Sequence, residues 1–156
     1  MSRTQLRLRR ATPEDEDLLL RWANDSEVRA MARRRDPIAP DAHRAWYEGK
    51  LADPQCRIWI AELDGTPAGQ VRLDRRGASA EVDISVAADR RGRGVGHYML
   101  TAPALADWPG LERLEAAVRR GNRGSLGLFR GAGFAETGAD AEYLHFEKRL
   151  SDARTR

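Results

Sequence analysis

A segment rich in glycine and arginine lies at residues 88–97 and reads Ala-Asp-Arg-Arg-Gly-Arg-Gly-Val-Gly-His. Before it, Val82, Ile84 and Val86 alternate with polar residues, which is typical of a strand with one apolar face. After it, apolar residues recur at helical spacing. Glycine lets the backbone approach a ligand closely, and the first N–H groups of a helix have no internal partners. The segment therefore predicts a loop that binds a phosphate group.

Two common phosphate-binding patterns do not fit this loop. A Walker A loop requires a lysine at its end, whereas the only lysines, Lys50 and Lys148, lie elsewhere. The dinucleotide fingerprint Gly-x-Gly-x-x-Gly follows the first strand of its unit, whereas this loop lies past mid-chain and its third glycine comes one residue early. The spacing of Arg91, Gly94 and Gly96 is instead similar to the pyrophosphate loop of the Gcn5-related N-acetyltransferases, the GNAT superfamily.

A second motif resembles the same family. Asn122 is followed by Ser125, by Phe129 and by a closing Gly133-Phe134, and residues 114–118 before them have the character of a strand. The two motifs and their strands extend over residues 79–135 in the order found in the family. The chain is therefore identified as a member of the GNAT superfamily.

The resemblance implies which residues hold the acyl donor, acetyl-CoA. The backbone of the fourth strand would bind the pantetheine arm, at Ile84, Ser85 and Val86. The loop would hold the pyrophosphate, through Arg91, Gly92, Arg93, Gly94, Val95 and Gly96. The later motif would contact the cofactor arm, through Asn122, Ser125 and Phe129, and Asn122 is also a candidate helix N-cap. Nearby arginines are candidates for the 3′-phosphate, each equally well explained as a surface residue: Arg119, Arg120 and Arg123.

Acetyl transfer to an amine requires a group that accepts the ammonium proton. Glu81 lies ten residues before Arg91, where many family members carry a glutamate, and Asp83 is a second candidate on the same strand face. Alternatively, both are polar positions on a solvated face. Phe129 stands where many members have a tyrosine that protonates the thiolate, and Tyr98 and Tyr143 are the candidate substitutes. A module that binds acyl-CoA without catalysis is therefore a second hypothesis.

The amino-terminal third resembles two branches of the family, through residues 21–31 and through His43 and Trp46. One branch acetylates nucleotide-linked amino sugars of pseudaminic acid biosynthesis, and the other acetylates the amino termini of ribosomal proteins. The first is favoured, with a small-molecule amine as the partner and a nucleotide-linked amino sugar as the preferred acceptor. Arginines and aromatic rings would suit a nucleotide sugar, at Trp22, Arg29, Arg33, Arg34 and Trp46. Carboxylates would suit a peptide amino terminus, at Asp25, Glu27 and Asp36. Many members form dimers, which makes a homodimer an expectation.

The composition places these motifs in one domain, residues 1–156, with 41% hydrophobic and 33% charged residues. No signal peptide or membrane span is recognised, which predicts a cytoplasmic protein. The net charge of +3 and the cluster 33–35 do not indicate nucleic-acid binding. The histidines are too scattered to predict a metal site, and Cys56 reads as a strand residue.

The elements that must position these residues follow from periodicity and from turn signals. Strands are expected at residues 5–11, 56–63, 67–74, 79–87, 113–118, 134–137 and 142–149. Helices are expected at residues 13–24, 26–31, 41–51, 94–106 and 122–131, with Pro103 kinking the fourth or ending it early. This order predicts an α/β (α+β) protein with the GNAT fold: a mixed, mostly antiparallel sheet of about seven strands, splayed between the fourth and fifth, with helices on both faces.

Overall fold

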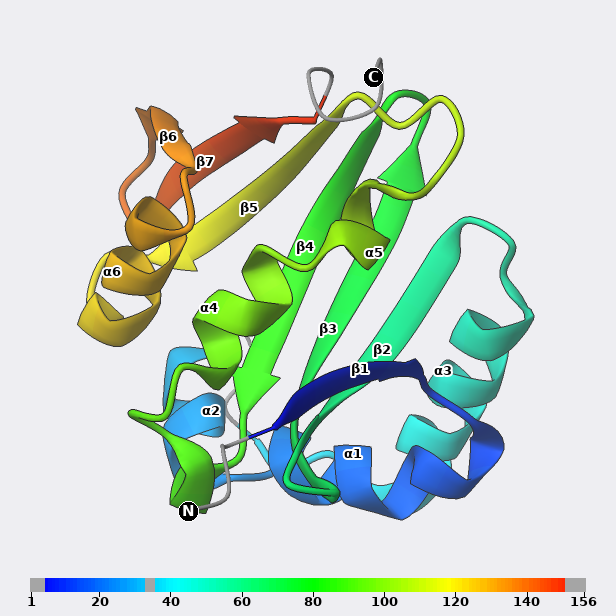
Figure 1. Cartoon of the computed structure of the whole chain (residues 1–156). Coiled ribbons are helices and arrows are strands. Elements are labelled where there is room, and N and C mark those ends of the chain that lie inside the picture. The colour runs from blue at the N-terminus through cyan, green and yellow to red at the C-terminus, as the bar shows by residue number, and fades with distance from the viewer. Residues whose placement is uncertain (1–4, 33–35, 151–156) are drawn as a thin grey trace.

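The computed structural model describes residues 5–32 and 36–150. Seven strands form one sheet in the order β1-β2-β3-β4-β5-β7-β6 (Figure 1). The strands are β1 (Leu6–Arg10), β2 (Cys56–Leu63), β3 (Thr66–Arg76), β4 (Ser79–Val86), β5 (Arg113–Arg119), β6 (Ala135–Ala139) and β7 (Tyr143–Arg149). The α-helices are α1 (Glu16–Ala23), α2 (Ser26–Met31), α3 (Pro40–Ala52), α4 (Val95–Leu100), α5 (Pro103–Ala106) and α6 (Arg123–Gly131). The expected mixed sheet is confirmed.

Strands β4 and β5 separate along their length. They pair in parallel only from Ser79 with Arg113 to Glu81 with Glu115, although β4 continues to Val86 and β5 to Arg119. Figure 1 shows the two strands diverging toward the lower part of the view. All other pairs of neighbouring strands are antiparallel. The sheet therefore has the expected splay between its fourth and fifth strands.

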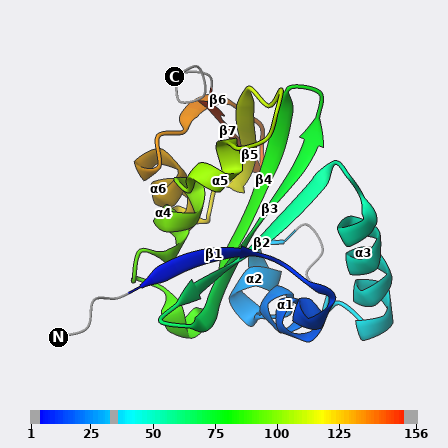
Figure 2. The same cartoon turned by 45° about the vertical axis from the view of Figure 1, so that its right-hand side comes forward.

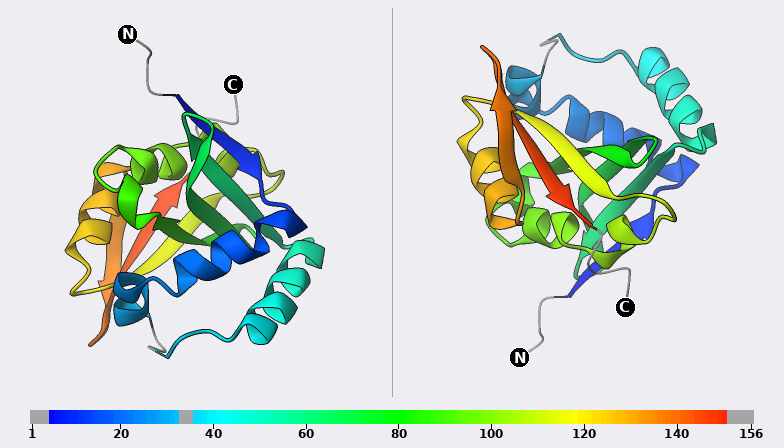
Figure 3. Two further views of the ribbon diagram at one scale, coloured as in Figure 1. Left: turned by 90° about the horizontal axis from the view of Figure 1, so that it is seen from below. Right: turned by 90° about the horizontal axis from the view of Figure 1, so that it is seen from above.

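Helices cover both faces of the sheet, as Figures 2 and 3 show. Helices α4, α5 and α6 pack over the larger apolar core, to which Val71, Leu114 and Phe146 contribute. On the other face, Leu19 of α1 and Tyr47 of α3 pack with β2 residues in a smaller core. Because strand residues alternate between faces, β2 supplies both layers, with Trp59 and Ala61 in the larger core and Ile58 and Ile60 in the smaller one.

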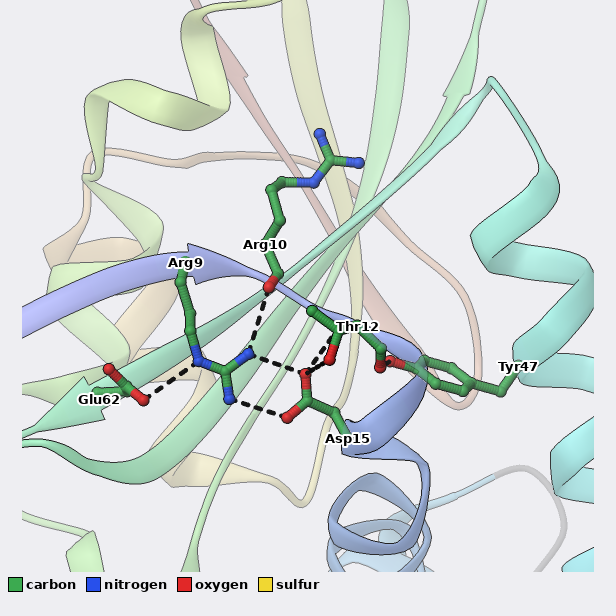
Figure 4. Close-up of polar contacts among 6 residues, drawn as sticks. All are labelled: Arg9, Arg10, Thr12, Asp15, Tyr47 and Glu62. Carbon is green, nitrogen blue, oxygen red and sulfur yellow. Dashed lines mark hydrogen bonds and ion pairs between the residues drawn. The ribbon is translucent and has the colours of Figure 1, made fainter.

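The smaller core carries a polar network at its margin (Figure 4). Both guanidinium amino groups of Arg9 donate to the Asp15 carboxylate at 2.8 Å, and Arg9 Nε donates to Glu62 at 3.1 Å. The Thr12 N–H donates to Asp15 Oδ2, and the buried Tyr47 hydroxyl donates to the Thr12 carbonyl at 2.6 Å. The Arg9 hydrogen bonds lower the pKa of Asp15, whereas burial raises the pKa of Tyr47 to about 12. The network joins β1, the start of α1, and α3.

The element order agrees with the expectation from sequence, with one correction. The helix expected over 94–106 is two helices, because α4 ends at Leu100 and α5 begins with Pro103 at its first position. Proline fits the first turn of a helix but cannot continue one from within. None of the helices in the described part of the chain is long and apolar enough to span a bilayer. That residues 1–156 form a single domain stays a prediction.

Candidate functional site

A cavity of about 1160 Å³ lies where β4 and β5 separate, and residues from both faces of the sheet line it. On one side, the loop wall comprises Ile84, Val86, Arg91, Gly92, Gly94, Val95, Gly96, Asn122, Ser125, Leu128 and Phe129. On the other side, the polar wall comprises Glu27, Arg29, His43, Trp46, Gln70, Arg72, Asp83 and Ser85. The cavity is large enough for an extended ligand and a second, smaller one.

Two glycines shape the loop wall. Gly94 has φ of 81°, a left-handed conformation that favours glycine, and it caps the start of α4. The first backbone bond of the helix runs from the Tyr98 N–H to the Gly94 carbonyl. At Gly96, an added Cβ would lie 2.5 Å from Cδ2 of Leu128, so its absence lets α4 approach α6. The backbone N–H groups after Gly94 are thus presented at the cavity.

Most residues that the sequence assigned to the cofactor line this cavity. They are Ile84, Ser85, Val86, Arg91, Gly92, Gly94, Val95, Gly96, Asn122, Ser125 and Phe129. Arg93 is exposed and does not belong to the lining. Asn122 also caps α6, since its side-chain oxygen accepts a hydrogen bond from the Ser125 N–H at 3.2 Å. Arg90 and His97 line the cavity as well, and no motif had singled them out.

Arg91 has partners that its place in the loop did not suggest. Its guanidinium forms an ion pair with the Glu27 carboxylate and lies 3.4 Å from Asp25 Oδ2. Asp25 is the N-cap of α2, accepting from the N–H groups of Glu27 and Val28. An arginine expected at a pyrophosphate therefore connects the loop with helix α2.

Phe129 is a core residue as well as a lining residue. Its side chain is 3% exposed, and its ring packs edge-on against Phe134 at 5.0 Å and stacks near Phe146 at 6.1 Å. Of the two tyrosines considered as substitutes for an acid, Tyr143 lines the cavity and Tyr98 does not. The Tyr143 ring lies under Arg119, at 5.2 Å.

The two candidate carboxylates of β4 differ in position. Glu81 pairs with Glu115 in the last register position before the splay and does not line the cavity. Asp83 lies two residues further on, within the splayed part, and lines it. The structure therefore brings Asp83, and not Glu81, to the lining of the cavity, and which of the two accepts the proton stays a prediction. The alternation of the strand places both residues on one face, but it does not indicate where pairing with β5 stops.

Asp83 is surrounded by polar side chains of β3 that the sequence did not single out. Gln70 Nε2 lies 3.0 Å from Asp83 Oδ2 and 3.2 Å from Ser85 Oγ, and Arg72 Nη1 lies 3.7 Å from Asp83 Oδ2. Arg72 also lies over the Trp46 ring, at 5.0 Å. The signal was available in the antiparallel hairpin, because its register sets Gln70 opposite Ser85 and Arg72 opposite Asp83.

Histidine and tryptophan side chains of the amino-terminal helices take different positions. His43 is 4% exposed, stacks on Tyr47, and has a pKa lowered by burial. Its Nδ1 has no hydrogen-bond partner among the described residues. Trp46 lines the cavity with 41% of its surface exposed, whereas Trp22 packs against the smaller core.

Of the remaining basic candidates, Arg29 and Arg119 line the cavity, whereas Arg120 and Arg123 do not. Arg119 donates to the carbonyls of Met31 and Ala32 at 2.8 and 3.1 Å, so it connects β5 with the end of α2. Arg120 donates to the Asp140 carbonyl at 2.8 Å. Arg33 and Arg34 lie outside the described residues. In the described part of the chain, no three His, Cys, Asp or Glu side chains are grouped so that they could hold a metal ion.

Comparison with known proteins agrees with this geometry. The model of the acetyltransferase (GNAT) domain family matches residues 5–135. The chain belongs to the GNAT family. This acetyltransferase is 30% identical over 118 residues to the putative phosphinothricin acetyltransferase YwnH of Bacillus subtilis (strain 168), covering 70% of the chain and 71% of the relative. It is also 33% identical over 93 residues to the mycothiol acetyltransferase of Clavibacter michiganensis subsp. michiganensis, of which it covers 30%.

Solved structures of other acetyltransferases share the fold of this chain. The spermidine N-acetyltransferase of Vibrio cholerae, in complex with CoA and spermine, aligns over 94% of this chain and 96% of its own, with a TM-score of 0.81 and 19% identity. The aminoglycoside acetyltransferase AAC(6′)-Ib, in complex with coenzyme A and kanamycin, aligns over 97% and 100%, with a TM-score of 0.80 and 18% identity. The chain is an acetyl-CoA-dependent N-acetyltransferase, so the hypothesis of a non-catalytic module is not retained.

Proposed function

We propose that the acetyltransferase acts on a small-molecule primary amine that enters along the polar wall, and that Asp83 accepts the proton of its ammonium group. One observation carries this proposal: Asp83 is the carboxylate of β4 that lines the cavity within the splay, whereas Glu81 lies in the paired segment. A carboxylate at this position can deprotonate an ammonium directly or through one water.

The loop wall is proposed to hold acetyl-CoA, which supplies the acetyl group as a thioester. Beyond Glu81, the β4 edge has no register partner in β5, so the backbone groups of Ile84 to Val86 are available to a pantetheine arm. The N–H groups after Gly94 suit a pyrophosphate, and the guanidinium groups of Arg90 and Arg91 add charged donors. Gly96 supports this arrangement, because a side chain at that position would collide with Leu128 and push α4 away from α6.

No acid at position 129 is required by this proposal. A thiol has a pKa of about 8.5, so its thiolate is an adequate leaving group near neutral pH. Phe129 carries no proton to donate, and its packing against Phe134 and Phe146 accounts for an aromatic ring at this position. Proton transfer is thus needed chiefly at the amine.

The identity of the amine is a finer proposal. The sequence favours a nucleotide-linked amino sugar. The exposed ring of Trp46 could stack on the base of the nucleotide, whereas the Trp22 ring packs against the smaller core. A cationic amine is a second candidate, because Glu27 and Asp83 both present carboxylates to the cavity. Glu27 and Asp25 also keep the amino terminus of a peptide among the acceptors to be tested. The proposed homodimer is tested separately by sedimentation of the purified chain.

The test compares two variants, Asp83→Asn and Glu81→Gln. The second is the matched control, because it removes one negative charge from the same strand two residues away. We expect Asp83→Asn to lower kcat at least tenfold with acetyl-CoA affinity unchanged, and Glu81→Gln to lower it less than threefold. CoA release is measured on a panel containing a nucleotide-linked amino sugar, spermidine, kanamycin and an amino-terminal peptide. Equal losses in both variants, or a loss confined to Glu81→Gln, would contradict the assignment of Asp83.

A further inference from the structure

Gln70 is a buried amide in the polar wall. Gln70 is 8% exposed and lies in the middle of β3. Its Nε2 donates to Asp83 Oδ2 at 3.0 Å and to Ser85 Oγ at 3.2 Å. Since an ionised carboxylate only accepts hydrogen bonds, the opposite orientation of the amide would set two oxygens against each other. The contact with Asp83 therefore fixes how the Gln70 side chain is oriented.

Among the described residues, the hydrogen bond and the ion pair of Asp83 both fall on one of its two oxygens. Gln70 Nε2 and Arg72 Nη1 both approach Oδ2, at 3.0 and 3.7 Å. Arg72 is held in turn by Asp74, whose Oδ2 lies 2.8 Å from Arg72 Nε, and Asp74 pairs with Lys50 at 2.7 Å. The Asp83 side chain is nevertheless 53% exposed. This arrangement fixes Oδ2 and leaves Oδ1 for a ligand.

We infer that Gln70 is a positioning residue for the acetyl transfer, holding Asp83 so that Oδ1 faces the incoming ammonium. The inference rests on the proposed role of Asp83. A carboxylate on a short side chain has rotamers that turn it out of the cavity, and a hydrogen bond from a buried amide to one oxygen selects among them. Gln70 suits this task because it lies in the segment Gly69–Asp74 of β3, which is paired with β2 on one side and with β4 on the other.

The test is a double-mutant cycle in the full-length enzyme with acetyl-CoA and the acceptor found in the panel. Gln70→Met keeps the volume and removes the donor, and Gln70→Glu keeps the shape and a polar end while replacing the donor with an oxygen. Each is measured alone and together with Asp83→Asn, with thermal melting as the check on folding. We expect each single variant to lower kcat about tenfold, with both KM values within threefold of the parent.

The cycle separates two kinds of failure. If Gln70 acts through Asp83, its replacement lowers kcat by less than twofold in the Asp83→Asn background. The inference is overturned if Gln70→Met and Gln70→Glu leave kcat within twofold of the parent, or if they lower it equally with Asp83 and with Asn at position 83. If Asp83→Asn alone retains full kcat, the proposed base is wrong, which is a separate result.

Discussion

The two walls of the cavity are built in different ways. The loop wall consists largely of backbone, glycine and aliphatic side chains from β4, the loop and α4, which follow one another along the chain, together with residues of α6. The polar wall consists largely of polar, charged and aromatic side chains from α2, α3, β3 and β4, with a hydrogen bond between β3 and β4 and a contact of the Arg72 guanidinium with the Trp46 ring. The loop wall requires glycine where the backbone turns or where helices approach closely, at Gly94 and Gly96. A wall made of side chains can change its acceptor while the fold stays the same.

The largest expected effect distinguishes a core residue from a binding residue on the loop wall. Phe129→Ala removes a ring packed between Phe134 and Phe146, and we expect the free energy of unfolding to fall by about 3–5 kcal/mol. Urea denaturation measures this change. A loss below about 1 kcal/mol, together with weaker acetyl-CoA binding, would mean that the ring serves the ligand more than the core.

The polar network at the margin of the smaller core, which contacts helix α3 behind the polar wall, is tested at Asp15. Because hydrogen bonds from Arg9 lower the pKa of Asp15, its contribution to stability is present above the pKa of an unfolded aspartate, about 3.9, and is lost as the pH falls through the folded value. Asp15→Asn should lower the free energy of unfolding by about 2 kcal/mol at pH 7. The difference from the parent should shrink toward pH 3 in denaturation curves. A difference that is independent of pH would contradict an ionic role for Asp15.

The left-handed turn of the loop wall is tested at Gly94. An alanine at φ of 81° is strained by about 1–2 kcal/mol, so Gly94→Ala should destabilise the protein by that amount and raise the Kd for acetyl-CoA. Gly127→Ala is the matched control, because Gly127 lies within α6 and nothing surrounds its missing Cβ within 4 Å. That control should be neutral or stabilising. If both variants behave alike, the conformation of Gly94 is not what the loop requires.

Trp46 tests whether the polar wall binds the acceptor. Trp46→Ala removes an exposed ring, which should raise the acceptor KM about fivefold, or about 1 kcal/mol, and leave the KM for acetyl-CoA unchanged. Leu51→Ala on the same helix truncates another exposed apolar side chain and should change neither value. An equal rise in both KM values for Trp46→Ala would show that the two walls are not independent.

The smallest expected effect is at the contact between the walls. In the proposed complex, Glu27 would compete with the pyrophosphate for Arg91, so Glu27→Gln should lower the Kd for acetyl-CoA about threefold, or about 0.6 kcal/mol, in calorimetry. The side chains are 77% and 37% exposed, and such pairs are weak. Glu48→Gln on α3 gives the matched loss of charge and should have no effect. Acetyl-pantetheine, which lacks the pyrophosphate, should bind equally to the parent and to Glu27→Gln.

Most of the loop wall follows from local motifs in the amino-acid sequence. Arg91, Gly94, Gly96 and Asn122 belong to local motifs, and the boundaries of strands and helices follow from periodicity, proline and glycine within a few residues. The division of the helix at Pro103 also follows from the sequence, because proline has no backbone N–H group to donate a hydrogen bond within a helix. These features depend on neighbours along the chain, which a sequence displays directly.

The polar wall, in contrast, depends on contacts between segments that are far apart in the chain. The contact of Arg91 with Glu27 joins residues 64 positions apart, and Asp83 rather than Glu81 lines the cavity because β4 and β5 part after Glu81. The place where pairing ends depends on the packing of both strands. The alternation of side chains along one strand carries no information about it. The hydrogen bonds of Gln70 likewise follow from strand register. Registers and contacts between distant segments are set by the packing of the whole sheet, and local patterns leave them open.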